Sequence, residues 1–570
     1  MAKSDKQTVA RIIVDTLARH GVDVMFSQSL PSAVLLAAED RNIEQFMYRT
    51  ENAGTVMADG YARISGKVGV VSAQNGPAAT LLVPGLAEAL KVSVPIVALV
   101  QDVVRAQADR NAFQEFDHIA LFQSCTKWVR RVTEASRIVD YIDMAFANAA
   151  SGRPGPVVLI LPADLLLEEI EVPEQRKSNL GYFPLDRAVA DPDRIDEAVE
   201  LLASASNPLL LAGGGVHLSA ASDAVAALQR DAHMPVMTTV MGKGVVDERH
   251  PLSLGVTGYA MGKLSPTRYM RPLIEAADVI LLVGTRTNQN ATDSWALYPQ
   301  HARYIHIDVD GAEIGRNYEA LRLNGDARLT LEAIYEKLKG RREPVPETEA
   351  RIADAKQKHA TDIAVLEQSD DSPIRPERLA ADIRQVLTAG MIVVADASYA
   401  TLWVACYLPS LKVGMRFITP RGLAGLGWGL PLAIGAKVAC PDSPVLCMVG
   451  DGGFAHVWAE LETAARRKTP VVLTVLNNSC LGYQKDAEDV KFGRHSTACY
   501  FTAVDHAAIA RASGCRGIRI EKASEYLPAL REALACNETT VLDVITDPAA
   551  YPPVTFFDGL DDIRASKAES

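Results

Sequence analysis

The sequence predicts an α/β protein with three doubly wound parallel sheets, and three observations support this prediction. Short apolar runs rich in Val, Ile and Leu recur along the 570 residues, with helical patterns between them. Strands buried on both faces of a helix-covered parallel sheet have this composition. Two polar, proline-containing segments, 167–192 and 340–376, separate pieces of ordinary domain size. Hydrophobic residues make up 48% of the chain, which is enough for several cores.

These linkers divide the chain into predicted domains at 1–170, 190–340 and 370–548, with a tail at 549–570. The first domain opens with an amphipathic pattern, MAKSDKQTVARIIVDTL, which predicts a helix. We expect the final residues, DIRASKAES, to fray, as polar chain ends commonly do. The predicted strands include 68–73, 95–100, 156–162, 279–284, 304–309, 391–396, 445–450, 471–477 and 540–545.

Composition and charge exclude several classes of protein. The net charge of −12 argues against a nucleic-acid binder, whose binding face would be basic. No apolar run reaches the roughly 18–20 residues that cross a bilayer, and no signal peptide is apparent. The eight cysteines contain no CxxC pair, which indicates reduced thiols rather than disulfides or structural zinc. We therefore expect a cytoplasmic protein that has neither nucleic acid nor membrane as a partner.

Two loops that follow predicted strands hold residues suited to a bound ion. Residues 450–453 read GDGG directly after one strand, and Asn478 follows the next strand along the chain. Glycines let the backbone approach a ligand, and free amides at a helix start favour an anion. A carboxylate beside a phosphate makes sense if a divalent cation lies between them, and Mg²⁺ takes hard oxygen ligands. Asp451, Asn478 and the carbonyl of Cys480 are therefore the predicted metal ligands.

Either loop alone would be an ordinary turn, but together they are specific, because Asn478 lies 27 positions after Asp451. This spacing resembles the thiamine diphosphate motif. Over nearly its whole length the chain is similar to the acetolactate synthase and 2-oxo acid decarboxylase group. The resemblance implies an enzyme dependent on thiamine diphosphate and Mg²⁺ that makes or breaks a C–C bond beside a carbonyl. It also implies three domains in chain order: pyrimidine-binding, middle nucleotide-binding-like and diphosphate-binding.

A second segment, RTENAGTVMADGYARISG, resembles the part of this family that faces the aminopyrimidine ring of the cofactor. In the family Glu51 would be the catalytic glutamate. A carboxyl group bonded to N1′ favours the imino tautomer, which removes the C2 proton. Burial suits a glutamate to this role because it raises the pKa of a carboxyl group. The alternative is an ordinary glutamate on the surface of a helix.

A third segment, TPRGLAGLGWGLPLAIGAKVA at 419–439, resembles the family element that supports the pyrimidine. The resemblance places Leu426 under the bent cofactor and makes the Ala424 carbonyl an acceptor for its 4′-amino group. The alternative is a glycine-rich loop that leads into a packed helix. The cofactor-binding residues that the resemblance implies are Glu51, Ser398, Tyr399, Ala424, Gly425, Leu426, Gly450, Asp451, Gly452, Gly453, Asn478, Cys480, Leu481 and Gly482.

The reaction pocket departs from acetolactate synthase in places. Gln28 lies where the family has a Pro-Gly turn near C2, so it is a predicted catalytic residue, or else part of a local loop variant. Gln114, in the family-like stretch AFQEFDHIA, would line the acceptor side. Ala487 replaces a tryptophan that favours 2-oxobutyrate as acceptor, so that choice of acceptor is not supported. Tyr483 and Gln484 are better placed to shape a different pocket.

The middle domain resembles one that holds FAD in acetolactate synthases and ADP in acyl-CoA enzymes. Arg286 matches a cofactor-contacting arginine, whereas Asn290 replaces a second one, so FAD or ADP stays open. In the family, Glu51 and the metal site would come from different subunits. The resemblance therefore implies a homodimer or homotetramer with shared active sites, acting on a small-molecule substrate.

Two other reactions fit the same cofactor. These are 2-hydroxyacyl-CoA cleavage and decarboxylation of an aromatic 2-oxo acid such as benzoylformate. The acidic tail PPVTFFDGLDDIRASKAES offers little to bind coenzyme A. A non-catalytic binding protein on the same fold is the remaining alternative. The presence of both Glu51 and Asp451 argues against it.

Overall fold

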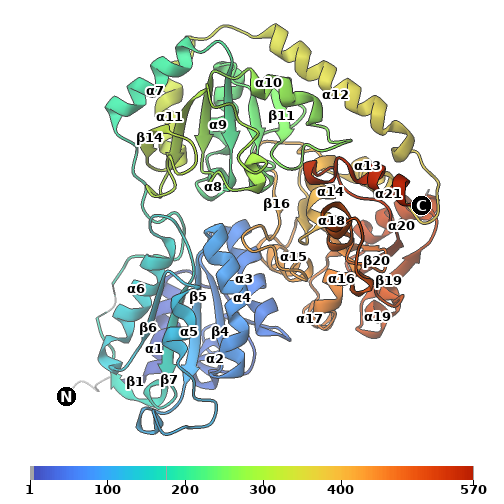
Figure 1. Cartoon of the computed structure of the whole chain (residues 1–570). Coiled ribbons are helices and arrows are strands. Elements are labelled where there is room, and N and C mark those ends of the chain that lie inside the picture. The colour runs from blue at the N-terminus through green and yellow to red at the C-terminus, as the bar shows by residue number, and fades with distance from the viewer. Residues whose placement is uncertain (1–5, 175, 569–570) are drawn as a thin grey trace. The chain divides into compact units, whose positions relative to one another are not determined.

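The structure is a computed structural model that describes residues 6–174 and 176–568. Figure 1 shows three sheets with helices around them, and each sheet has six strands joined by parallel ladders. The prediction of three parallel α/β sheets is therefore confirmed. The chain forms two compact units, the first comprising Met1–Asp186, Pro420–Asp442 and Val457–Val471, and the second comprising Arg187–Thr419, Ser443–His456 and Val472–Ser570.

The first sheet has the strand order β3-β2-β4-β5-β7-β6. The chain enters at the inner strand β2, adds β3 on one side and continues with β4 on the other. The strands are β2 (Val24–Ser27), β3 (Glu44–Met47), β4 (Gly69–Ala73), β5 (Ile96–Asp102), β6 (Trp128–Arg131) and β7 (Val157–Pro162). The helices of this region are α1 (Val9–Arg19), α2 (Ser32–Glu39), α3 (Glu51–Ser65), α4 (Pro77–Val92), α5 (His118–Gln123) and α6 (Ile138–Ala150). A short antiparallel pair joins β1 (Lys6–Thr8) to β8 (Glu169–Glu171).

The middle sheet has the order β11-β10-β9-β12-β13-β14, which is the order of dinucleotide-binding folds. Its strands are β9 (Pro208–Ala212), β10 (Val236–Thr238), β11 (Ser253–Val256), β12 (Val279–Val283), β13 (Arg303–Asp308) and β14 (Ala320–Asn324). Its helices are α7 (Pro192–Ser204), α8 (Gly214–Leu218), α9 (Ser222–Asp231), α10 (Arg271–Glu275) and α11 (Ala327–Leu338).

The third sheet has the order β16-β15-β17-β18-β20-β19, so each strand takes the place that its counterpart takes in the first sheet. Its strands are β15 (Ile392–Ala395), β16 (Phe417–Ile418), β17 (Val445–Gly450), β18 (Val472–Asn477), β19 (Arg516–Ile520) and β20 (Thr540–Ile545). The helices are α13 (Pro376–Val386), α14 (Tyr399–Tyr407), α15 (Gly429–Ala439), α16 (Asp451–Phe454), α17 (Glu460–Arg466), α18 (Gly482–Phe492), α19 (His506–Ala512), α20 (Ala523–Ala535) and α21 (Leu560–Ala568).

Within the first compact unit, α3 and α15 cross at very short range because glycines line their contact. A Cβ atom on Gly60 would lie 2.5 Å from the carbonyl oxygen of Leu432, and one on Gly435 would lie 2.0 Å from that of Met57. Real Cβ atoms do not approach a carbonyl oxygen so closely, so only glycine permits this crossing. The crossing fixes α3, the helix that Glu51 begins, against the segment that follows the loop at 424–426.

The expectation that the tail frays is wrong for its described part, and the predicted linker at 340–376 is partly helical. The linker at 340–376 contains a 22-residue helix, α12 (Pro346–Glu367), with charged residues along its length. The tail is docked through residue 564 rather than frayed, because the Arg564 guanidinium donates to Asp486 at 2.6 Å and Leu560 is fully buried. Among the described residues, no helix has both the length and the apolar character needed to cross a bilayer.

Candidate functional site

The third sheet brings two predicted cofactor residues to adjacent strand ends. Ser398 follows β15 and Asp451 follows β17, and these two strands pair directly. The chain reverses its direction of strand addition between them, and ligands of open α/β sheets bind outside the carboxyl ends of the strands at such a point. The topology therefore places the GDGG loop where this architecture commonly holds a ligand.

Asp451 is a buried carboxyl group that the local backbone orients. One carboxyl oxygen accepts from the Gly452 amide at 2.9 Å, and the other accepts from the Ser479 amide at 2.7 Å. Burial, assisted by the charge of Asp543, raises the pKa of Asp451 to about 6, although the two amides act in the opposite direction. A nearby cation would therefore stabilise the ionised form of this carboxyl group.

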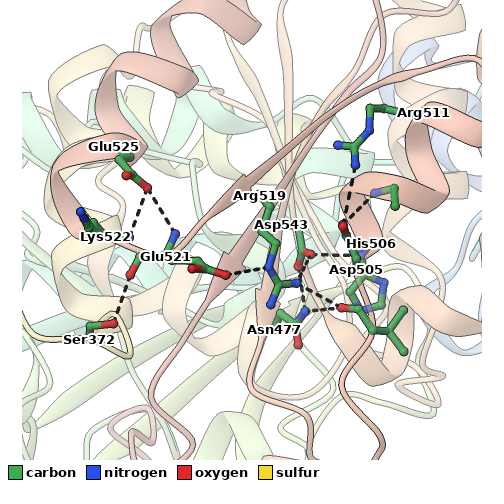
Figure 2. A network of polar contacts seen from close by, with 12 residues as sticks. Ser372, Asn477, Asp505, His506, Arg511, Arg519, Glu521, Lys522, Glu525 and Asp543 are labelled. Carbon is green, nitrogen blue, oxygen red and sulfur yellow. Dashed lines mark hydrogen bonds and ion pairs between the residues drawn. The ribbon is translucent and has the colours of Figure 1, made fainter.

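The two asparagines that end β18 have different surroundings. Asn477 is buried, and its side-chain amide donates to Asp543 at 2.8 Å and to the Val504 carbonyl at 2.9 Å. Figure 2 shows this network, in which Arg519 also reaches Asp543, at 3.2 Å. Asn478 is only half-buried, and its side-chain oxygen accepts from the Cys480 amide at 3.1 Å. Asn477 therefore anchors the strand end, while Asn478 begins the loop beyond it.

The loop after Asn478 contains Cys480, which is buried and carries a neutral thiol. Burial raises the pKa of the Cys480 thiol to about 11, so the thiol stays protonated at neutral pH. The flanking backbone is held on both sides of Cys480. The Phe501 amide donates to the Ser479 carbonyl, and the Leu481 amide donates to the Cys499 carbonyl, each at 2.8 Å. These contacts favour the prediction that Cys480 acts through its carbonyl.

The Tyr399 hydroxyl belongs to a buried network of polar contacts. Its hydroxyl donates to the fully buried Asp486 at 2.5 Å, and Asp486 also accepts from Lys485 and Arg564. The Tyr399 hydroxyl is thus engaged in a structural network, which leaves its backbone amide for a ligand. A Cβ atom on Gly482 would lie 2.9 Å from the Tyr399 ring, so this network also brings the start of α18 close to α14.

Glu51 begins α3 in the first compact unit. Thr50 caps the helix, since its side chain accepts from the Ala53 amide at 3.4 Å. The Glu51 side chain is buried, with 7% of its surface exposed, and it forms no hydrogen bond with any described residue. A buried carboxyl group that the surrounding chain does not engage is suited to a ligand, as the sequence predicts.

Gln28 and Gln114 both belong to loops around the first sheet. The Gln28 side-chain amide donates to the Arg49 carbonyl at 3.3 Å, which brings it to the segment just before Glu51. Gln114 has a left-handed backbone (φ 61°), and its side-chain oxygen accepts from Gln74 at 2.7 Å. Gln28 follows β2, and Gln114 bonds to Gln74, which follows β4. Both predicted residues therefore lie near the ends of β2 and β4, between which the direction of strand addition reverses.

The loop at 424–426 lies in the same compact unit as Glu51. Ala424 has a left-handed backbone (φ 61°), which an alanine adopts only when its surroundings hold it there. Gly425 lies against the Trp428 ring, where a Cβ atom would be 2.7 Å away. Leu426 is half-buried beside this turn. The strained, closely held turn is consistent with a functional role for these residues.

The structure of the middle domain does not decide whether FAD or ADP binds there. A Cβ atom on Gly215 would lie 2.7 Å from the Cα of Gly284, so these two glycines let neighbouring turns pack together. The Asn290 carbonyl accepts from the Tyr259 amide at 2.8 Å, and Asn290 begins a short 3₁₀ turn. The strand order favours a nucleotide here, but the glycine contacts have a structural cause, so the nucleotide stays a prediction.

Comparison with known proteins identifies the family. Residues 7–121 match the N-terminal TPP binding domain of thiamine pyrophosphate enzymes, 195–334 match their central domain, and 396–544 match their C-terminal TPP binding domain. The chain belongs to the thiamine pyrophosphate enzyme family. It is thus a thiamine diphosphate-dependent enzyme.

Relatives of this thiamine pyrophosphate enzyme match nearly its whole length. The probable acetolactate synthase large subunit of Methanococcus aeolicus is 34% identical over 95% of this chain and 92% of its own length. That of Methanocaldococcus jannaschii is 34% identical over 96% of this chain and 93% of its own. The acetolactate synthase isozyme 3 large subunit of Escherichia coli is 31% identical, over 98% and 99%. The enzyme is therefore similar to acetolactate synthase.

The residues present fit a hard divalent cation bound beside the diphosphate. No group of three or more His, Cys, Asp or Glu side chains suited to a metal occurs in the described part of the chain. The predicted set instead combines one carboxylate, one amide oxygen and one backbone carbonyl, which suits Mg²⁺ when phosphate oxygens and water complete its shell. The partly buried loop and the raised pKa of Asp451 agree with this assignment.

Proposed function

We propose that this enzyme decarboxylates a 2-oxo acid and joins the remaining fragment to a carbonyl acceptor, using Mg²⁺ to hold thiamine diphosphate. One observation supports the proposal most strongly. Asp451 and Asn478 leave the ends of β17 and β18, which are paired strands with Gly450 opposite Leu476. This arrangement offers oxygen ligands from two neighbouring strands at one edge of the sheet. The relatives named acetolactate synthase supply the reaction type.

The metal-binding part of the proposal assigns each ligand to an atom. A carboxylate oxygen of Asp451, the side-chain oxygen of Asn478 and the carbonyl of Cys480 would hold the cation. The amides of Gly452 and Ser479 already orient the Asp451 carboxyl group, so little reorganisation is needed when the ion binds. Asn477, anchored on Asp543, fixes the strand end from which Asn478 extends.

When bound, thiamine diphosphate supplies a carbon nucleophile and stabilises the negative charge left when CO₂ departs. The chain's own contribution is proton control and orientation. Glu51 would hold a proton at N1′ of the pyrimidine, and its burial keeps competing water away. The Ala424 carbonyl would accept from the 4′-amino group, while Leu426 would support the bent cofactor. Gln28 and Gln114 would contact the substrate.

We further propose an assembly of two or four copies. In that assembly, each cofactor would be held by Asp451 of one chain and by Glu51 of the partner subunit. The support is the resemblance described from the sequence, together with the large-subunit relatives. Light scattering should give at least a dimer, and a catalytically active monomer would contradict the shared site.

The reaction is tested by supplying single 2-oxo acids with thiamine diphosphate and Mg²⁺. We expect CO₂ release from pyruvate and a carboligation product that carries both fragments. Benzoylformate and a 2-hydroxyacyl-CoA serve as comparison substrates. Turnover of either one in preference to every aliphatic 2-oxo acid would replace the proposal with the corresponding alternative. Omitting the cofactor from the same assay is the control.

A further inference from the structure

Glu88 is a buried residue whose carboxyl group accepts hydrogen bonds from the loop at 422–424. It lies on α4 with 1% of its surface exposed. Its carboxyl oxygens accept from the amides of Gly422 at 2.7 Å, Leu423 at short range and Ala424 at 3.3 Å. A Cβ atom on Gly422 would lie 2.9 Å from a Glu88 oxygen, so glycine is required for this approach. Three consecutive amides thus hold the backbone just before the predicted pyrimidine contacts.

Glu460 does the same for the segment just before Glu51. It begins α17 and is fully buried. One of its oxygens accepts from the Thr50 amide at 3.0 Å, and both accept from the Arg49 amide, at 3.1 and 3.2 Å. The Thr463 hydroxyl donates to the same carboxyl group at 2.8 Å. The start of α3 is therefore fixed by a carboxylate that is distant in the sequence.

The two contacts are related by the repeated topology. α4 follows the third strand of the first sheet in chain order, and α17 follows the third strand of the last sheet. α3 and α15 likewise follow the second strand of each sheet. Each third-strand helix therefore supplies a glutamate to the loop that precedes the second-strand helix from the other sheet. All four helices belong to one compact unit.

Both contacts cost desolvation, which indicates that the fold uses them for more than burial. An ionised carboxyl group taken out of water is unfavourable unless hydrogen bonds replace its hydration. Here backbone amides supply those bonds, and hydrogen bonds to a charged group are shorter and stronger than neutral ones. Gly85, on the Glu88 helix, also packs on α3, since a Cβ atom there would lie 2.6 Å from Thr55. The helices and the loops they hold are therefore packed directly against one another.

We propose that Glu88 and Glu460 are a reciprocal pair of positioning residues. Glu460 sets the position of the Glu51 carboxyl group, and Glu88 sets the position of the loop that carries Ala424 and Leu426. Each acts through backbone amides, so each is a positioning residue rather than a catalytic one. This inference rests on the proposed function, since it concerns the two elements assigned to the pyrimidine ring.

Amide hydrogen–deuterium exchange of the cofactor-free, full-length protein tests the contacts themselves. The variants are Glu88→Gln and Glu460→Gln, which keep side-chain size but replace one acceptor oxygen with an amide. Exchange should rise roughly tenfold, the worth of one charge-assisted hydrogen bond, at residues 421–426 in the first variant and at 49–54 in the second. Rapid exchange of these amides in the wild type would overturn the inference without any variant.

Glu462→Gln is the matched control. Glu462 lies on the same helix as Glu460, but its carboxyl group contacts the side chains of Arg49 and Arg466, at 2.8 and 2.9 Å, rather than backbone amides. Its exchange pattern should match the wild type. If the control variant loosened residues 49–54 as much as Glu460→Gln, the contact would be a general packing effect and the proposal would be overturned.

The split between two cofactor measurements distinguishes positioning from general stability. Glu460→Gln should slow hydrogen exchange at C2 of bound thiamine diphosphate by roughly tenfold, while the affinity for the cofactor changes less than threefold. Glu88→Gln should weaken cofactor affinity by roughly tenfold, while the rate of C2 exchange changes less than threefold. Equal losses of both quantities in both variants, or no loss in either, would overturn the inference. Absence of C2 exchange in the wild type would instead contradict the proposed function, and the amide measurement would still decide the contacts.

Discussion

The first and third sheets have the same strand order but different residues at equivalent strand ends. After its third strand in chain order, the first sheet continues with Gln74 and Asn75, and the last sheet continues with Asp451. The Asn75 side chain bonds to a loop of its own domain, because its amide donates to the Gln114 carbonyl at 3.1 Å. Asp451 is instead a carboxyl group whose pKa burial raises to about 6. The same topology thus places a carboxyl group after the third strand of the last sheet, and a neutral amide that holds a loop after the third strand of the first sheet.

This difference shows that topology supplies a place for a ligand and the strand-end residues decide its chemistry. Both sheets reverse between their first and third strands, where open α/β sheets bind ligands. The first sheet adds Glu51 after its second strand, while the same stretch of the last sheet reads TPRGLAGLG, without an acid. Proton transfer is therefore assigned to one sheet and metal binding to the other. Each assignment can be tested by changing one side and leaving its counterpart.

The largest expected effect comes from Glu51→Gln, which removes the acid–base group from the first sheet. Glutamine keeps the size and a hydrogen bond but cannot exchange a proton with N1′. Hydrogen–deuterium exchange at C2 of the bound cofactor should slow by roughly 10²–10⁴-fold, the usual contribution of a positioned acid–base group. Cofactor affinity should change little. Glu39→Gln, an exposed position at the end of α2, is the control, and equal C2 exchange in wild type and Glu51→Gln would remove Glu51 from the mechanism.

The next effect concerns the metal side. Asp451→Ala should weaken thiamine diphosphate binding in the presence of Mg²⁺ by about 100-fold or more, since even outer-shell changes at metal sites cost 10–100-fold. Asn75→Ala, just beyond the end of the third strand of the first sheet, should leave this affinity within about threefold, because the Asn75 amide is already engaged by the Gln114 carbonyl. Fluorescence titration with and without Mg²⁺ measures both. Unchanged affinity in Asp451→Ala would contradict the metal assignment.

A smaller effect follows from the raised pKa of Asp451, about 6 against about 3.9 in an unfolded chain. The folded chain binds this proton more tightly, so the stability contribution is complete below about pH 4 and is lost as the pH rises through about 6. Above that pH, the ionised carboxyl group costs the cofactor-free protein roughly 2–3 kcal/mol. Asp451→Asn should therefore unfold at a higher temperature than the wild type at pH 8.

Thermal unfolding in the absence of metal and cofactor measures this effect. The advantage of Asp451→Asn should shrink as the pH falls toward 4, because the wild-type carboxyl group becomes neutral. Asn75→Asp supplies the converse test in the first sheet, where a new buried charge should lower stability at pH 8. A wild type that is more stable than Asp451→Asn at pH 8 would show that the buried carboxylate is already compensated.

Much of the fold could be predicted from local sequence, and so could the placement of Asp451 and Asn478 at the ends of neighbouring strands. Runs of β-branched residues fixed the strands, as at 445–450 and 540–545, which coincide with β17 and β20. The GDGG loop and Asn478 were predictable because strand ends in a parallel sheet meet at one edge. Nothing in the local sequence indicated that Asn477 anchors the strand end, because its partner Asp543 lies 66 residues away in the chain.

Long-range polar contacts explain what local patterns missed. Glu88 lies in the apolar stretch GLAEALKV, an unusual place for an acid, and that was the one available signal. The sequence around Glu460 contained no such signal, because Glu460 accepts from the backbone amides of residues 49 and 50, which are distant in the chain. The docked tail was also hidden, since DIRASKAES is polar by composition and Arg564 is held by contacts distant in the chain, to Asp486 and to the Ala549 carbonyl. Such contacts are visible only after the chain has folded.

The smallest expected effect concerns the choice of acceptor. Ala487 is 9% exposed and belongs to the hydrophobic core of the third domain, so it presents no large side chain to an acceptor. Supplied with equal amounts of pyruvate and 2-oxobutyrate, the enzyme should make the two products in a ratio within about threefold of unity. A pocket shaped to accept the additional methylene of 2-oxobutyrate would instead favour the mixed product by about 10–200-fold.

Competition experiments with product analysis measure this ratio, and Tyr483→Ala shows which side chain controls it. The Tyr483 ring packs edge-on against Phe557 at 5.4 Å and against Tyr399 at 5.9 Å, with 36% of the residue exposed. If Tyr483 limits acceptor size, its removal should shift the ratio toward 2-oxobutyrate. Gln484→Ala is the companion variant, and it should shift the ratio less than Tyr483→Ala does, because Gln484 donates to Glu488 at 2.8 Å on the exposed side of α18. A wild type that strongly prefers the mixed product would show that residues other than 487 supply the family's selectivity.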